Sequence, residues 1–164
     1  AIQREPAAFA GAVLQAPAVA MPADVGPALL GVVRFLGAVW PSLPVRPFFK
    51  PERATRDLAF QAWMRTDPYT YRGWVKAGTA RRSMQLIKEV RAELSKVRCP
   101  VLITHGAEDL RVLPSVTESL ASQLGGPVER HVFPNLRHEA HQEPERDEVV
   151  GSWVDWLVRH SEVG

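Results

Sequence analysis

Apolar residues along this chain fall into two patterns, and each pattern predicts a different kind of element. Short apolar runs bounded by proline or glycine occupy residues 9–15 and 99–106. Such runs are typical of parallel strands buried on both faces, and we place the second strand at residues 101–104. Elsewhere apolar residues recur every three or four positions, which predicts helices with one buried side.

The C-terminal part of the chain is predicted to alternate strand and helix. After the strand at 101–104, the segment "LPSVTESLASQLGG" predicts a helix, with Ser115 and Glu118 as a capping box and Gly125 as its stop. A strand follows at 128–133, and then a last helix with Pro144 in its first turn and Arg159 and His160 in its last. Five apolar residues of that helix are expected to face the sheet: Val149, Val150, Trp153, Val154 and Leu157. Strands and helices in this order, with short connections, predict a right-handed parallel α/β layer.

Residues 18–95 have a different character from the segments on either side. An apolar helix is expected at 25–40, followed by the proline-rich turns of "WPSLPVRPFFKP" and by more polar helices. In the last of these, apolar residues recur at helical spacing and should form a core stripe: Met84, Ile87, Val90, Leu94 and Val97. We interpret residues 1–17 and 96–164 as one α/β core and residues 18–95 as a mostly helical insertion. An insertion at the carboxyl end of a strand lies over the crevice where α/β proteins bind ligands, so it is a candidate cap or lid.

Composition narrows the class of protein. The 164 residues are 46% hydrophobic and 23% charged, which is typical of one globular domain. A net charge of +2, with acids and bases interspersed, argues against a nucleic-acid partner. The single Cys99 excludes an internal disulfide, and neither a membrane span nor a signal peptide is expected, so a cytoplasmic location is favoured. Because Ala1 is not an initiator Met, we expect the chain to belong to a longer polypeptide.

Two candidate chemical groups follow the ends of successive predicted strands. Asp109 comes just after the strand at 101–104, and His138 just after the strand at 128–133, 29 residues later. Neighbouring parallel strands lie about 4.8 Å apart, so the loops that leave them can bring both side chains into contact. A carboxylate held against an imidazole is the acid–base half of a nucleophilic triad. Taken singly, Asp109 could equally be an acid near a helix and His138 a loop histidine.

The sequence "RHEAHQE" raises the alternative of a metal site. A zinc-protease helix needs its second histidine four residues after the first, and that position after His138 holds Gln142. No metal is therefore expected. We interpret His141 as a surface histidine and Glu139 as a support for its loop. Five aromatic residues are weaker candidates for lining an acyl pocket, since aromatics in a cap more often pack against one another: Trp40, Phe48, Phe49, Trp63 and Trp74.

At these positions the sequence resembles the monoacylglycerol lipase and lysophospholipase-like α/β-hydrolases. The resemblance rests on "PVLITHGAEDLRVLP" followed by "FPNLRHEAHQEPERDEVVGSWVDWL", on "FAGAVLQAPAVAM", and on a cap segment, "RTDPYTYRGWVKAGTARRSMQLI". It implies an α/β-hydrolase fold with an inserted helical cap, and serine esterase activity on lipid-like monoesters. By position it makes Asp109 the triad acid and His138 the triad base. No cofactor is implied, and transient contact of the cap with a membrane surface is a further expectation.

The chain departs from this family in one respect, because it holds no G-x-S-x-G nucleophile elbow. None of its serines has the flanking glycines: Ser42, Ser83, Ser95, Ser115, Ser119, Ser122, Ser152 and Ser161. The resemblance implies that the serine lies upstream, on the rest of the same protein or on a partner chain. Two alternatives stay open: a catalytically inert interaction module, and an α/β-hydrolase with an Asp nucleophile, such as a dehalogenase or an epoxide hydrolase.

Overall fold

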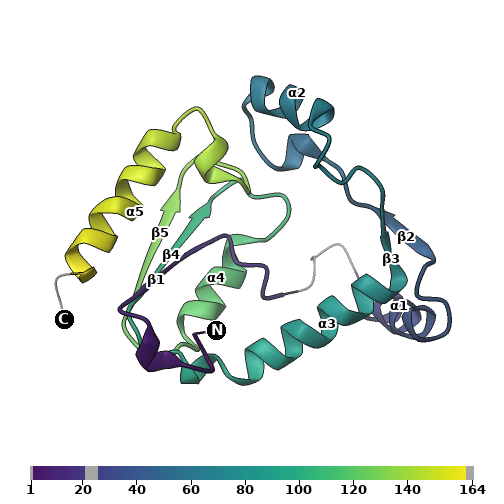
Figure 1. The fold of residues 1–164 in the computed structure, drawn as a ribbon, viewed down its shortest axis with the longest axis horizontal. Helices are drawn as coiled ribbons and strands as arrows, with labels where there is room; N and C mark the ends of the chain where they lie inside the picture. The colour runs from purple at the N-terminus through teal and green to yellow at the C-terminus, as the bar shows by residue number, and fades with distance from the viewer. Residues whose placement is uncertain (1, 21–25, 162–164) are drawn as a thin grey trace.

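A parallel three-stranded sheet organises the C-terminal part of the molecule. The computed structural model describes residues 2–20 and 26–161 (Figure 1). Its strands β1 (Ala12–Gln15), β4 (Val101–Gly106) and β5 (Val128–Phe133) lie in the order β1-β4-β5. Both pairings are parallel, with Ala12 opposite Val101 and Val101 opposite Val128. The predicted parallel layer is therefore confirmed, although β1 begins at Ala12 rather than at residue 9.

Strand β4 is the centre of this sheet, and all six of its residues are buried. Because side chains alternate along a strand, β4 contributes to two separate cores. Val101 and Ile103 belong to an apolar cluster that includes Leu120 of α4 (Pro114–Ala121). On the other face, the hydroxyl of Thr104 accepts a hydrogen bond of 3.1 Å from the indole of Trp153 in α5 (Arg146–Ser161). The helices α4 and α5 thus lie on opposite sides of the sheet (Figure 1).

Helix α5 presents a different side to the sheet from the one predicted. Val149 and Trp156 are fully buried and Trp153 is half-buried, whereas Val150, Val154 and Leu157 are exposed. The prediction was correct for Val149 and Trp153 and wrong for the other three. The burial of Trp156 depends on a contact that the helical periodicity cannot reveal. Its ring lies against Gly11, just before β1, and a β-carbon on Gly11 would come within 2.8 Å of that ring.

The starts of both C-terminal helices also differ from the predictions. Pro114 is already the first residue of α4, so Ser115 lies inside the first turn and makes no capping hydrogen bond. The helix ends at Ala121, before Gly125. Helix α5 begins at Arg146, so Pro144 belongs to the turn before it, while Arg159 and His160 do lie in its last turn as predicted.

Residues 26–96 form three helices and a short antiparallel pair of strands. The helices are α1 (Pro27–Val39), α2 (Leu58–Thr66) and α3 (Ala77–Ala92), and the strands are β2 (Pro44–Pro47) and β3 (Trp74–Lys76). Short 3-10 turns occupy Pro6–Ala8, Pro51–Arg53, Leu94–Lys96 and Ala140–Gln142. The strands β2 and β3 were not predicted from the sequence. The apolar helix was predicted to begin at Val25, which lies outside the described residues. None of the described helices is long and apolar enough to cross a membrane.

The three helices occupy different positions relative to the sheet. Helix α1 packs on α3, where Gly37 lies so close to Ala77 that a β-carbon would meet the Ala77 carbonyl oxygen at 2.6 Å. Both helices extend to one side of the sheet, whereas α2 lies beyond the carboxyl ends of β4 and β5 (Figure 1). The segment that precedes α2 is therefore the part of the predicted cap that reaches the loops after these strands.

Candidate active site

Two loops at the carboxyl ends of β4 and β5 bring Asp109 and His138 together. We call residues 107–113, between β4 and α4, the acid loop, and residues 134–139, after β5, the histidine loop. His138 Nδ1 lies 2.8 Å from Asp109 Oδ2, which is a hydrogen-bond distance, so the two side chains make the contact that the sequence led us to expect. The adjacency of two parallel strands produces this contact, as the strand order required.

The carboxylate of Asp109 is fully buried and has hydrogen-bond partners on both oxygens. Oδ1 accepts the backbone N–H groups of Arg111, at 2.7 Å, and Val112, at 2.9 Å. Oδ2 faces His138 and a second histidine, His105, at 3.1 Å. Burial alone would raise the pKa of Asp109, but the hydrogen bonds from His105, His138 and Val112 outweigh it and hold the pKa well below its ordinary value. The carboxylate is therefore ionised at neutral pH.

His105 is the residue of this site that the sequence reasoning missed. It is fully buried in β4, four residues before Asp109, and its Nε2 lies 2.8 Å from the carbonyl oxygen of Val112 as well as near Asp109. Both neighbours are acceptors, so Nε2 must carry a proton. In the neutral ring Nδ1 is then an acceptor, and it has no hydrogen-bond partner among the described residues. The available signal was a titratable residue inside a strand whose other residues are uncharged.

The ring of His138 is oriented so that Nδ1, but not Nε2, contacts Asp109. Nδ1 is directed to Asp109, and the side chain is 18% exposed, so Nε2 is the atom that can exchange a proton with a reacting group. Its backbone carbonyl accepts a hydrogen bond from the side-chain amide of Gln15, the last residue of β1. All three strands of the sheet therefore contribute to the position of this ring.

The other candidates from the sequence lie outside this pair. His141 packs against the ring of Trp153, with centroids 5.8 Å apart, and its Nε2 is 3.7 Å from Glu139. Within residues 2–20 and 26–161, no group of three or more histidine, cysteine or carboxylate side chains is arranged so that it could hold a metal ion. Of the five aromatic residues, Phe48 approaches the acid loop, because the Arg111 guanidinium lies 5.9 Å from its ring centroid. Trp40, Trp63 and Trp74 are all more than half exposed.

The parallel sheet with flanking helices, an acid after one strand and a histidine after the next define an α/β-hydrolase. Solved structures share this fold. The monoacylglycerol lipase of Paleococcus ferrophilus superposes with a TM-score of 0.84 at 21% identity, over 96% of this chain and 62% of that chain. A soluble variant of the monoglyceride lipase of Saccharomyces cerevisiae, in complex with a substrate analog, gives 0.76 at 18% identity, over 90% of this chain and 55% of that one.

Sequence comparison defines the family. Residues 1–145 match the model of the hydrolase family described as serine aminopeptidase, S33, and the chain belongs to that family. It is monoacylglycerol lipase-like: a monoacylglycerol lipase of Mycolicibacterium smegmatis is 30% identical over 159 residues, which are 96% of this chain and 56% of that protein. The chain thus spans a little over half the length of this curated relative.

Proposed function

We propose that this chain supplies the acid–base half of a Ser-His-Asp triad, in a protein that hydrolyses lipid-like monoesters of the monoacylglycerol or lysophospholipid type. The observation that carries the proposal is the buried, ionised Asp109 at 2.8 Å from His138 Nδ1, in a chain of this hydrolase family. The nucleophilic serine and the oxyanion donors would lie outside these 164 residues.

In the proposed reaction, His138 Nε2 takes the proton of the serine hydroxyl as the serine oxygen attacks the ester carbonyl. The resulting imidazolium gives that proton to the leaving alcohol, and an acyl-enzyme remains. Water then attacks the acyl-enzyme with the same help from His138 and releases the carboxylic acid. Asp109 holds the ring by its Nδ1–H and stabilises the imidazolium in both steps. No metal or organic cofactor is needed.

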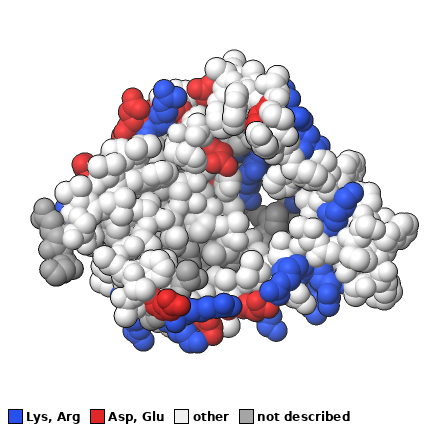
Figure 2. Space-filling view, viewed as in Figure 1, with Lys and Arg blue, Asp and Glu red and all other residues white. Residues whose placement is uncertain are grey.

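The preference for lipid-like substrates rests on the apolar surface of the cap region. Helix α1 exposes Leu29, Val32, Phe35 and Val39, each by more than half. In Figure 2 the end of the molecule that α1 forms is mostly uncharged, whereas Lys and Arg side chains gather along α3. An apolar surface of this kind fits an acyl chain or transient contact with a membrane surface.

A further requirement concerns the sheet. Within the described residues β1 pairs with β4 alone, which leaves its other edge open. Soluble proteins cover such edges, so we infer that strands from the rest of the polypeptide or from a partner chain pair with β1. The isolated 164 residues should then aggregate and show no ester hydrolysis.

The test uses the full-length polypeptide that contains these residues. It should hydrolyse p-nitrophenyl acyl esters and 1-monoacylglycerols, and His138→Ala should lower kcat/KM by at least about 10⁴-fold. His131→Ala is the matched control, because His131 is an exposed histidine on β5, away from the pair. Full ester turnover by the isolated chain, or by His138→Ala, would contradict the proposal.

The same assays separate the alternatives. An inert module would hydrolyse no ester and would not react with a fluorophosphonate probe, which labels activated serines. An enzyme with an Asp nucleophile would also resist the probe but would open an epoxide or dehalogenate a haloalkane. A polypeptide that the probe labels and that prefers short, polar acyl groups would keep the triad and reject the lipid-like substrate.

A further inference from the structure

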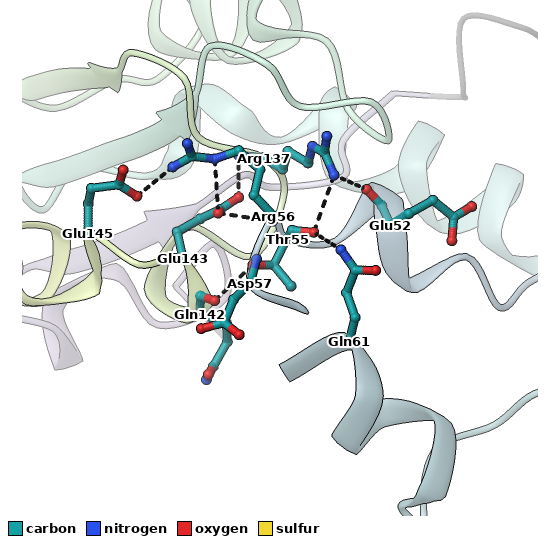
Figure 3. Close-up of polar contacts among 9 residues, drawn as sticks. All are labelled: Glu52, Thr55, Arg56, Asp57, Gln61, Arg137, Gln142, Glu143 and Glu145. Atoms are coloured by element: carbon teal, nitrogen blue, oxygen red, sulfur yellow. Dashed lines mark hydrogen bonds and ion pairs between the residues drawn. The ribbon is translucent and has the colours of Figure 1, made fainter. Parts of the chain in front are cut away.

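Glu143 is fully buried although it carries a carboxylate, and both of its oxygens have partners from different parts of the molecule. Oε1 accepts the backbone N–H of Arg137 at 2.9 Å, in the histidine loop. Oε2 accepts the backbone N–H of Arg56 at 3.0 Å and its Nε at 3.2 Å. Arg56 lies 87 residues away in sequence, just before α2. One buried side chain thus joins the histidine loop to the cap region (Figure 3).

The segment on the cap side of this junction is residues 50–57, which we call the cap strap. It contacts the histidine loop and the turn after it at several further points. The N–H of Glu139 donates to the carbonyl of Ala54 at 2.7 Å, and the hydroxyl of Thr55 donates to the carbonyl of Gln142 at 2.8 Å. The guanidinium of Arg137 donates to the carbonyl of Glu52 at 2.6 Å (Figure 3). Ala54 and Thr55 are fully buried, so water cannot replace these contacts without local opening.

The acid loop holds the other end of the same strap. The guanidinium of Arg111 donates to the carbonyl of Lys50 at 3.3 Å and lies over the ring of Phe48. Arg111 is also one of the residues whose backbone N–H holds Asp109. The cap strap is therefore fastened to both loops that carry the Asp109–His138 pair.

Hydrogen bonds bracket His138 itself. The N–H of the residue before it, Arg137, donates to Glu143, and the N–H of the residue after it, Glu139, donates to the cap strap. Any movement of the strap away from the core would therefore pull on the backbone next to the imidazole. An imidazole that must transfer a proton tolerates little displacement, since about 1 Å of misplacement can cost on the order of 100-fold in rate.

We propose that Glu143 is a positioning residue that locks the cap strap to the histidine loop, so that the position of the cap and the orientation of His138 change together. The expected effect of Glu143 on kcat rests on the proposed function. The coupling of the cap strap to the histidine loop does not depend on which substrate the protein hydrolyses.

The experiment compares Glu143→Gln with Glu145→Gln in the full-length polypeptide. The amide that the first substitution introduces has one acceptor oxygen and cannot serve Arg137 and Arg56 together. Glu145 is the matched control, because its carboxylate binds the same Arg56 at 2.5 Å but is 44% exposed. Amide hydrogen exchange is measured in peptides covering residues 50–57 and 137–142, and kcat and KM are measured separately.

For Glu143→Gln, exchange should rise at least tenfold in both segments, and kcat should fall about 10- to 100-fold with a smaller change in KM. Glu145→Gln should change each quantity less than about threefold, as expected for an exposed ion pair. Faster exchange in residues 137–142 alone would overturn the coupling, and an unchanged kcat with both segments loosened would overturn the positioning role. If the wild-type protein hydrolyses no ester, the proposed function fails, while the exchange data still decide the coupling.

Thr55→Val provides a second route if Glu143→Gln does not fold. Valine matches the shape of threonine but can neither donate to the Gln142 carbonyl nor accept the backbone N–H of Asp57. One contact between the strap and the following turn and one hydrogen bond within the strap are therefore lost, while Glu143 stays intact. The same paired rise in exchange is expected, at least threefold, with a fall in kcat in the same direction. If hydrogen exchange rises in residues 50–57 but not in residues 137–142, the proposal is overturned.

Discussion

Gly106, the last residue of β4, allows the histidine loop to pass close to the strand, and its replacement by alanine is a direct test of the site. A β-carbon at this position would lie 2.2 Å from the carbonyl oxygen of Leu136 and 2.4 Å from that of Arg137. Ordinary contacts with carbon lie near 3.5 Å, so the loop would have to retreat by roughly 1 Å. Both contacts are to backbone, so a change of side-chain rotamer cannot relieve them.

Movement of Leu136 and Arg137 would displace the next residue, His138, and would disturb its 2.8 Å hydrogen bond to Asp109. A displacement of about 1 Å should lower kcat/KM of Gly106→Ala by on the order of 100-fold. The strain should also lower the free energy of unfolding by about 1–3 kcal/mol, since overpacking in a dense core has costs of that size. The loss in activity should therefore be large while most molecules remain folded.

The assay is p-nitrophenyl ester hydrolysis by the full-length polypeptide, with urea unfolding followed on the same samples. Gly151→Ala is the control: Gly151 lies within α5, and a β-carbon there meets no atom within 4 Å. It should leave kcat/KM unchanged and raise the free energy of unfolding by about 0.5–1 kcal/mol, because alanine favours the helix. If Gly106→Ala keeps kcat/KM within threefold of wild type, the close approach does not position His138 and the reasoning is refuted.

Two further predictions concern the buried carboxylate of Asp109. Hydrogen bonds depress its folded-state pKa below the value of about 3.9 in an unfolded chain, so its contribution to stability is present above that pH and is lost as pH falls toward the folded pKa. In urea unfolding, wild type should therefore lose more stability between pH 7 and pH 3 than Asp109→Asn, and equal losses would contradict the assignment. His105→Phe removes a donor to this carboxylate and should lower kcat/KM about 10- to 100-fold, since a hydrogen bond to a charged group contributes about 1.5–3 kcal/mol. His105→Gln, which keeps a donor, should lie closer to wild type in the same assay; equal losses in the two variants would exclude a role for the donor.

The sheet and the Asp109–His138 pair could be predicted because local signals determine both. A continuous apolar run between proline and glycine marks a buried strand, and an acid and a histidine after successive parallel strands must emerge at the same edge. Helix α5 was harder, because apolar residues lie on more than one of its sides. Contacts with Gly11 and Glu129 decide that Trp156 is buried and Val154 exposed, and neither contact is local.

The residues that support the pair could not be found from local patterns. His105 is hidden inside a strand, where its ring contacts Asp109 only because the chain turns back after Gly106. The contact between Arg56 and Glu143 spans 87 residues, and a salt bridge at that separation leaves no periodic signal. Ser115 failed as a cap for a simpler reason, since the proline before it had already begun the helix.

The pairing of β1 with β4 has a consequence for how the protein is made. Ala12 and Val101 lie opposite each other in the parallel register and are separated by 101 − 12 = 89 residues, and the N–H of Ala12 donates to the carbonyl of Pro100. Helices α1, α2 and α3 all lie between the two strands in sequence. Closing a loop of that length costs about 4 kcal/mol of chain entropy before the pairing can form. At ribosomal rates of about 5–20 residues per second, β1 leaves the ribosome roughly 4–18 seconds before its partner strand. Throughout that interval the edge of β1 that pairs with β4 lacks its native neighbour, so we expect the nascent chain to expose an unpaired strand edge until residues 101–106 have been translated.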